Sequence, residues 1–232
     1  MVRLTLQGDL LELLGSRIVS GEYPPNHVLR TDDLEGEFDL SRTVVRETLK
    51  VLESMRLVAL RRAVGITVLS PQEWNVFDPR VIRWRLAGPL REEQLRTLTG
   101  LRLAIEPVAA RGAAANATLE QKAELLALAE RMEAADANGD DFDVKEFLAA
   151  DVAYHRLLLL ASGNEMFAAL ADVITEVLNA YAAGNQEHPG AAGIDGPHLH
   201  VVAARAIDKG DLAVAETVLR EILAEVNQLI GD

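Results

Sequence analysis

Residues 41–50 read SRTVVRETLK, and this segment predicts a helix that recognises DNA. Ser41 can cap the helix, because a serine side chain accepts a hydrogen bond from a backbone N–H of the first turn. Arg42, Arg46 and Lys50 recur every four residues, so they share one face. Apolar residues at the other positions predict a buried side. A helix-turn-helix places a helix of this kind in the major groove.

The flanking segments predict the other parts of a winged helix-turn-helix module. Apolar residues recur at helical spacing through residues 6–20, and a second short helix is expected over residues 31–38. Two strand-like segments, 57–60 and 66–69, flank the basic turn RRAVG at residues 61–65. Three helices and a two-stranded wing would complete such a module.

Charge is distributed unevenly along the chain. The net charge of −13 would by itself oppose binding to phosphate. Residues 1–85, however, contain equal numbers of acidic and basic residues, so all of this charge lies on residues 86–232. Basic residues outnumber acidic ones within residues 42–62, the predicted recognition helix and wing. This asymmetry predicts two domains, of which only the first binds DNA.

The composition excludes cysteine-based sites and gives no sign of a membrane-spanning or exported protein. The chain has no cysteine, which excludes disulfides, thiolate metal sites and cysteine nucleophiles. No segment approaches the roughly 20 apolar residues of a membrane span, and the N-terminus lacks the pattern of a signal peptide. We therefore expect a cytoplasmic protein with no membrane partner.

The sequence pattern divides the chain into three parts. Residues 1–70 form the predicted winged helix-turn-helix domain. Residues 71–90 form an apolar connector with both tryptophans, which we expect to pack the domains together rather than to stack on a ligand. Residues 91–232 are rich in alanine and leucine, so the fold class is mainly α, with a C-terminal all-helical antiparallel bundle. Its helices are expected near residues 91–115, 118–136, 141–162, 164–183, 196–208 and 211–230.

Three potential metal ligands lie in the bundle. Asp151 and His155 are four residues apart and therefore lie on one stripe of a helix. Such a pair alone is more often a surface hydrogen bond, but His200 begins a later helix among apolar residues. One carboxylate and two imidazoles suit a divalent transition metal with open positions, and zinc is the commonest occupant.

The order of these motifs resembles the GntR family of bacterial transcription regulators, in the FadR-like subgroup whose effector domain is called FCD. The first domain contributes the match at residues 41–47, SRTVVRE. The second contributes LRLAIEPVAA at residues 101–110, the run from Asp151 to Asn164, and the run from His200 to Asp211. The resemblance covers nearly the whole chain and implies a DNA-binding regulator that responds to a small molecule.

The resemblance implies roles for residues of the first domain. Those implied in DNA binding are Ser41, Arg42, Thr43, Arg46, Arg62 and Gly65. The two arginines of the recognition helix would contact operator bases and phosphates, the serine and threonine would contribute backbone hydrogen bonds, and the last two residues would act at the wing. A homodimer on a near-palindromic double-stranded operator is implied as well.

In the second domain the resemblance implies a metal site of Asp151, His155 and His200. The family usually has a further histidine at a position that is Ile222 in this chain, and isoleucine cannot bind a metal. Water or effector oxygens would then complete the coordination, with lower metal affinity than in members that keep that histidine.

Residues 74–84 add a narrower resemblance, to members of the family that control sugar-acid catabolism. Galactonate- or gluconate-like effectors present a carboxylate and adjacent hydroxyls, which can chelate an open metal and pair with an arginine. Arg102 is implied as that arginine, and an ordinary salt bridge between Arg102 and Glu106 is the alternative. Repression that the ligand relieves is the default, because it is the commoner arrangement in the family.

Two other functions stay open at this point. A metal-dependent hydrolase would use the metal to activate water, but it lacks an identified general base and leaves the DNA-binding module unexplained. A metal-free regulator of the acyl-CoA type would have an apolar cavity, and the three potential metal ligands argue against it.

Overall fold

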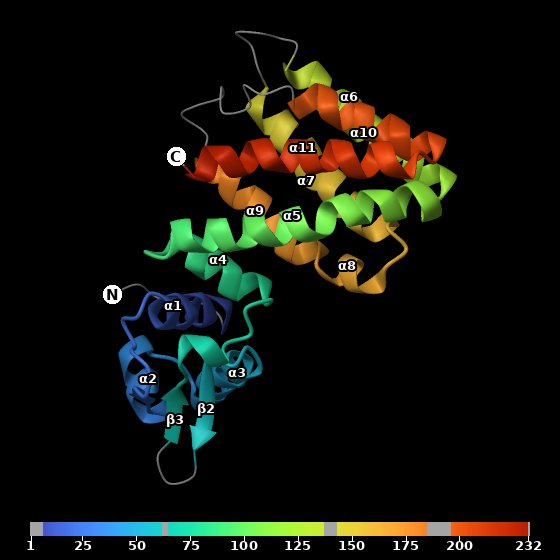
Figure 1. Cartoon of the computed structure of the whole chain (residues 1–232). Helices are drawn as coiled ribbons and strands as arrows, with labels where there is room; N and C mark the ends of the chain where they lie inside the picture. The colour runs from blue at the N-terminus through green and yellow to red at the C-terminus, as the bar shows by residue number, and fades with distance from the viewer. Residues whose placement is uncertain (1–6, 62–64, 137–142, 185–195, 232) are drawn as a thin grey trace. The chain divides into compact units, whose positions relative to one another are not determined.

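The computed structural model describes residues 7–61, 65–136, 143–184 and 196–231 (Figure 1). The chain divides into two compact units, residues 1–92 and 93–232, each with a hydrophobic core. None of the helices in the described part of the chain has both the length and the apolarity that a membrane crossing requires.

The first unit is a winged helix-turn-helix, which confirms the fold class expected here. Helices α1, α2 and α3 lie close to where the spacing of apolar residues predicts them, and α3 begins directly after its cap, Ser41. The short 3-10 helix and α4 lie in the segment predicted as a connector. The elements are α1 (Gln7–Val19), β1 (Val28–Leu29), α2 (Thr31–Phe38), α3 (Arg42–Ser54), β2 (Val58–Arg61), β3 (Gly65–Val68), a short 3-10 helix (Pro71–Glu73) and α4 (Pro79–Ala87).

The wing belongs to a three-stranded antiparallel sheet rather than the two-stranded hairpin that the sequence predicts. β2 pairs with β3, so that Val58 lies opposite Val68. β1 pairs with the other edge of β3, with Val28 opposite Thr67, and gives the order β1-β3-β2. β1 has only two residues, too few for an alternating pattern to indicate a strand.

The core of the first unit includes both tryptophans of the predicted connector. Trp74 is buried, and its Nε1 donates to the carbonyl oxygen of Leu69 at 3.1 Å. Trp84 on α4 is also buried, and its Nε1 donates to Oε2 of Glu12 on α1 at 2.7 Å. A buried indole N–H needs an acceptor, so these two bonds fix the rings in the core that α1, α3 and the strands share.

The second unit is helical throughout its described residues, as expected from its composition (Figure 1). The single helix predicted over residues 164–183 is two helices, which Leu170 separates. The elements are α5 (Arg91–Asn116), α6 (Leu119–Asp136), α7 (Val144–Ala161), α8 (Glu165–Ala169), α9 (Ala171–Gly184), α10 (Gly196–Lys209) and α11 (Leu212–Gly231).

α5 approaches the end of α7 very closely. A Cβ atom on Gly112 of α5 would lie 2.5 Å from the carbonyl oxygen of Ser162, the residue that caps α7. Asn116, one turn further along α5, donates from Nδ2 to the same oxygen at 3.1 Å. α5 carries Arg102 and α7 carries the first two predicted metal ligands, so this contact sets the register between the two helices of the candidate site.

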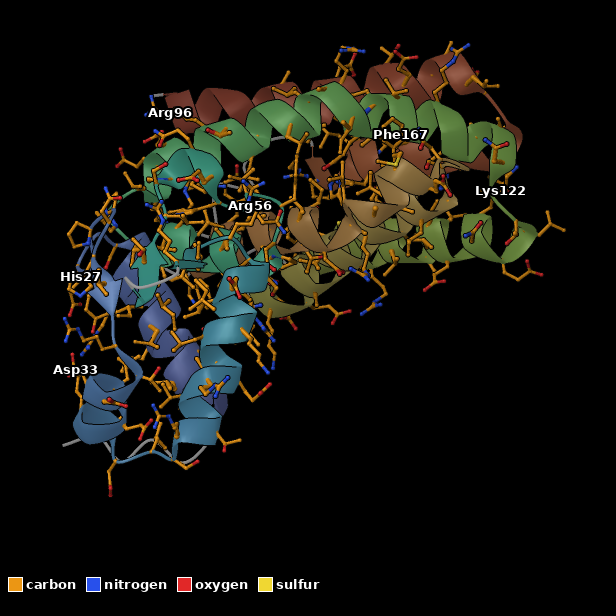
Figure 2. The ribbon with its side chains drawn as sticks, turned by 90° about the horizontal axis from the view of Figure 1, so that it is seen from below. His27, Asp33, Arg56, Arg96, Lys122 and Phe167 are labelled. Atoms are coloured by element: carbon orange, nitrogen blue, oxygen red, sulfur yellow. The ribbon has the colours of Figure 1, made fainter. Side chains whose placement is uncertain are left out.

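α10 packs between α6 and α11. Lys122 lies near the start of α6 (Figure 2), and its Nζ donates to the carbonyl oxygen of Asp208 near the end of α10 at 3.1 Å. Leu125 of α6 and Ile207 of α10 are both fully buried in the core of this unit. These contacts fix the helix that carries His200.

We expect Gly112→Ala to destabilise the second unit by about 1–3 kcal/mol, because the added methyl group meets backbone that cannot rotate away. Gly100→Ala is the matched control: it lies on the same helix, and its Cβ would meet no atom within 4 Å. That variant should gain about 0.5–1 kcal/mol from the better helix propensity of alanine. Denaturant unfolding of both variants measures the difference, and equal stabilities would contradict the close approach.

Candidate metal centre and DNA-binding surface

α7 and α10 bring the three predicted metal ligands together. Asp151 and His155 lie one turn apart on α7, and His200 lies in the first half of α10. Both histidines are buried and the aspartate is partly buried, and their ligand atoms all lie within 4.8 Å of one another. The three residues therefore form one cluster in the bundle.

The three ligand atoms are spaced as the ligands of one ion would be. Nε2 of His155 lies 3.3 Å from Nε2 of His200 and 3.3 Å from Oδ1 of Asp151. Nε2 of His200 lies 3.6 Å from the same oxygen. Two imidazole nitrogens that bind one zinc ion tetrahedrally, at ordinary Zn–N lengths, are about 3.3 Å apart. The residues present thus fit a divalent ion with a coordination position open.

The carboxylate of Glu106 on α5 contacts His155 at the ring nitrogen that does not contact the other two predicted ligands. Its Oε2 lies 2.7 Å from Nδ1 of His155, and its Oε1 accepts from Nε of Arg102 at 2.7 Å. A carboxylate at one imidazole nitrogen orients the other nitrogen toward a metal and makes it a better ligand. The sequence indicates Glu106 only as a salt-bridge partner of Arg102. Its contact with α7 is long-range, so residue spacing cannot reveal it.

Burial and neighbouring charges shift the pKa values of the site. Burial raises the pKa of Asp151, but His155, His200 and Arg102 together outweigh burial and lower that pKa to about 2. Burial also opposes ionisation of Glu106, whose pKa Arg102 and His155 nevertheless lower to about 2. Burial lowers the pKa of His155, but Glu106 and Asp151 together outweigh burial and raise that pKa to about 9. Both carboxylates are therefore ionised at neutral pH, the state in which Asp151 can bind a cation.

The structure agrees with the sequence that the further histidine ligand usual in the family is missing at position 222. Ile222 of α11 is buried in the core cluster of this unit and offers no ligand atom. His198 on α10 is exposed, and its Nδ1 lies 3.2 Å from Oε1 of Glu133. His198 therefore lies outside the cluster, although it is only two residues from His200.

Arg102 is fully buried and forms the salt bridge with Glu106 that the sequence left as an alternative. Its Nη2 also lies 3.4 Å from Oε2 of the same carboxylate. Burial opposes the charge on Arg102, and the adjacent Glu106 nonetheless raises the pKa of the guanidinium. A role for Arg102 in effector binding stays a prediction.

α3 presents the predicted basic face to solvent. Oγ of Ser41 accepts a hydrogen bond from a backbone N–H of the first turn at 3.5 Å. Arg42, Thr43 and Arg46 are exposed. Nη2 of Arg42 lies 3.2 Å from Oδ1 of Asp32 on α2, and both side chains are exposed. Exposed ion pairs are weak, so a phosphate group can displace Asp32 at little cost.

A groove of about 340 Å³ lies between the recognition helix and the wing. Its lining includes Arg42, Arg46 and Lys50 of α3 and Leu60 and Ile66 of the strands. Cationic groups from the helix thus line a groove whose other wall comes from the wing, and Glu53 contributes an acidic group to the same lining.

Of the two predicted DNA-binding residues at the wing, the structure describes Gly65 but not Arg62. Gly65 begins β3 with a φ of +110°, a conformation that favours glycine because it has no Cβ atom. Arg62 lies outside the described residues. The parts that these residues play in DNA binding remain predictions.

Comparison with known proteins identifies the family. Residues 6–68 match the family of bacterial regulatory proteins named gntR, and residues 97–225 match the FCD domain. The chain belongs to this family of regulators. It is 31% identical to the uncharacterized HTH-type transcriptional regulator YieP of Escherichia coli over 74% of each chain. It is also 30% identical to the galactonate operon transcriptional repressor of the same organism, over 72% of this chain and 71% of that one.

A solved structure shares the fold of this regulator. The E. coli protein McbR/YncC is 19% identical, covers 98% of each chain and has a TM-score of 0.54. The family and these relatives consist of transcription regulators, so this chain is a DNA-binding transcription regulator and not a metal-dependent hydrolase. The resemblance to the FadR-like subgroup with an FCD domain is confirmed.

We expect His200→Ala to lose its divalent ion on dialysis, because two remaining protein ligands hold an ion poorly. His198→Ala is the matched control on the same helix and should keep about one ion per chain, like the wild type. Elemental analysis of protein expressed with added zinc should show at least about tenfold less metal in His200→Ala. Equal metal content in the two variants would show that the ion binds elsewhere.

Proposed function

We propose that this regulator is a homodimeric repressor that a sugar acid, of the galactonate or gluconate kind, releases from its operator in the cytoplasm. The observation that carries the proposal is the buried cluster of Asp151, His155 and His200, whose spacing suits one divalent ion. The 30% identity with the galactonate operon repressor supports the class of effector.

A divalent ion, zinc foremost, would be held by these three side chains. The ion would supply a positive charge that attracts a carboxylate. Because Ile222 offers no ligand atom, oxygen atoms from outside the protein would complete the coordination. A carboxylate and an adjacent hydroxyl of a sugar acid supply two such oxygens, whereas an acyl chain supplies none. The donor set therefore favours a chelating acid over the acyl effector.

Arg102 would act beside the ion as a second positive charge for the acid. Its Nε and Nη2 atoms contact Glu106. A guanidinium has five N–H donors in a planar fork, so it can serve a second carboxylate while it keeps the first. Arg102 would thus connect the effector to the same carboxylate that orients His155.

The DNA-binding part of the proposal rests on the exposed face of α3. Each module can read only a few base pairs, so one half-site would bind weakly, and a dimer would place two recognition helices on a near-palindrome. Ser41, Arg42, Thr43 and Arg46 would contact one half-site from the helix, with Gly65 and Arg62 at the wing.

We predict that Arg46→Ala weakens specific DNA binding about tenfold or more, the loss expected when an arginine contact to a base is removed. Arg80→Ala removes an exposed arginine from α4, outside the recognition helix, and should leave the affinity unchanged. Gel-shift titrations at fixed salt, on DNA selected by the wild-type protein from a random library, give the comparison. Helical content should be the same in all three proteins, and unchanged affinity in Arg46→Ala would refute the contact.

We predict that D-galactonate or D-gluconate raises the melting temperature of the zinc-loaded protein by a few degrees at about 100 times its dissociation constant. A chelator should abolish this shift, because the acid binds through the ion. Thermal unfolding with and without the chelator measures the effect. An acyl thioester that stabilises the metal-free protein, where the sugar acids do not, would favour the acyl-type regulator instead.

A further inference from the structure

Tyr154 is fully buried beside the metal cluster, and its hydroxyl has no hydrogen-bond partner among the described residues. Its ring packs edge-on against both imidazoles, with centroids 5.6 Å from His155 and 5.1 Å from His200. Buried hydroxyls in proteins nearly always have a partner, so a hydroxyl without one indicates a group that another molecule engages.

The position of Tyr154 on α7 places it on the side of the helix that forms the site. It follows Asp151 by three residues, and residues at this spacing lie next to each other on a helix surface. The rings of His155 and His200 are themselves 5.3 Å apart and nearly perpendicular, so the tyrosine ring packs against two sides of one cluster. The phenol is thus adjacent to the ligands without being one of them.

The other polar groups of the cluster lie within ion-pair distance of one another. Asp151 contacts both imidazoles, and Glu106 contacts His155 and Arg102. Ile222 lies in the same core cluster as Tyr154 and has no polar atom to offer it. The phenol is thus a donor beside this cluster that no described protein group engages, and it can serve a bound ligand together with Arg102.

We propose that Tyr154 is a specificity-determining residue whose hydroxyl donates a hydrogen bond to a carboxylate oxygen of the acid bound at the metal site. The inference rests on the proposed function, because the acid is held there by the ion. A carboxylate has two oxygens, so one can bind the ion while the other accepts from the phenol. A ligand without a second acceptor leaves the hydroxyl unpaired, and a buried site discriminates strongly against such ligands.

The test compares Tyr154→Phe, which removes only the oxygen atom, with Tyr23→Phe. The Tyr23 hydroxyl already accepts a hydrogen bond from Nη1 of Arg17 at 3.0 Å in the first unit, so that variant controls for the loss of any phenol oxygen. Full-length proteins loaded with Co²⁺ are titrated with acetate and with D-galactonate, and the visible absorption of the cobalt reports binding. Cobalt content and the melting temperature without ligand are measured on the same samples.

We expect Tyr154→Phe to bind both acids about tenfold or more weakly than the wild type, as loss of a hydrogen bond to a charged group predicts. Its cobalt content should be unchanged and its melting temperature equal or higher, because no partner within the protein is lost. Tyr23→Phe should bind both acids like the wild type.

Equal affinities in Tyr154→Phe and the wild type would overturn the proposal. Loss of cobalt in Tyr154→Phe would also overturn the proposal, because the hydroxyl would then serve the ion. A lower melting temperature of this variant would overturn it as well, because it would indicate that the hydroxyl has a partner within the protein. Wild-type protein that binds acetate but not D-galactonate would refute the sugar-acid function alone, and the acetate titration would still decide the role of Tyr154. Failure of the wild type to bind either acid would overturn both.

Discussion

The buried carboxylate of Glu106 is the constraint on which the packing of the second unit depends. It is fully buried, and each of its oxygens has a partner at 2.7 Å, Arg102 on its own helix and His155 on α7. An ionised group in such a place is tolerated only while its partners stay in contact, because the loss of one partner leaves an uncompensated charge. The relative position of α5 and α7 is therefore held by electrostatics as well as by packing.

Small residues make this electrostatic contact possible. α5 is lined with buried alanines on the side that faces the core, and Gly112 brings its backbone against the carbonyl oxygen of Ser162. A larger residue at that point would separate the helices and lengthen the contact between Glu106 and His155. The small residues of α5 thus determine both the packing of the bundle and the geometry of the cluster of Asp151, His155 and His200. A metal ion held by the cluster would in turn depend on the imidazole of His155, which contacts Glu106 of α5.

The parts of the molecule that were predictable from the sequence are those that local patterns specify. The periodicity of apolar residues gave the main helices, and the cap at Ser41 gave the start of α3. The spacing of Asp151 and His155 showed that one helix carries both, and the chemistry of the residue types, together with the family resemblance, connected them with His200. β1 was too short to show a pattern, and α4 was hidden in a segment interpreted as a connector. The contacts of Glu106 and Tyr154 arise from tertiary packing, which no spacing in one sequence encodes.

Helix α5 carries both the boundary between the two units and the residues proposed to bind the effector. The boundary between the two compact units falls inside this helix, which runs from Arg91 to Asn116 without interruption. From Arg91 to Glu106 a helix extends roughly 22 Å at 1.5 Å per residue. Arg102 and Glu106 thus lie about three to four turns from the unit boundary, on the helix whose first turn begins at Arg91. That turn follows directly from α4, whose Trp84 is fixed in the core of the winged helix-turn-helix unit. Two sites become coupled when both bias the same structural element, and α5 is the segment through which the chain connects the two units.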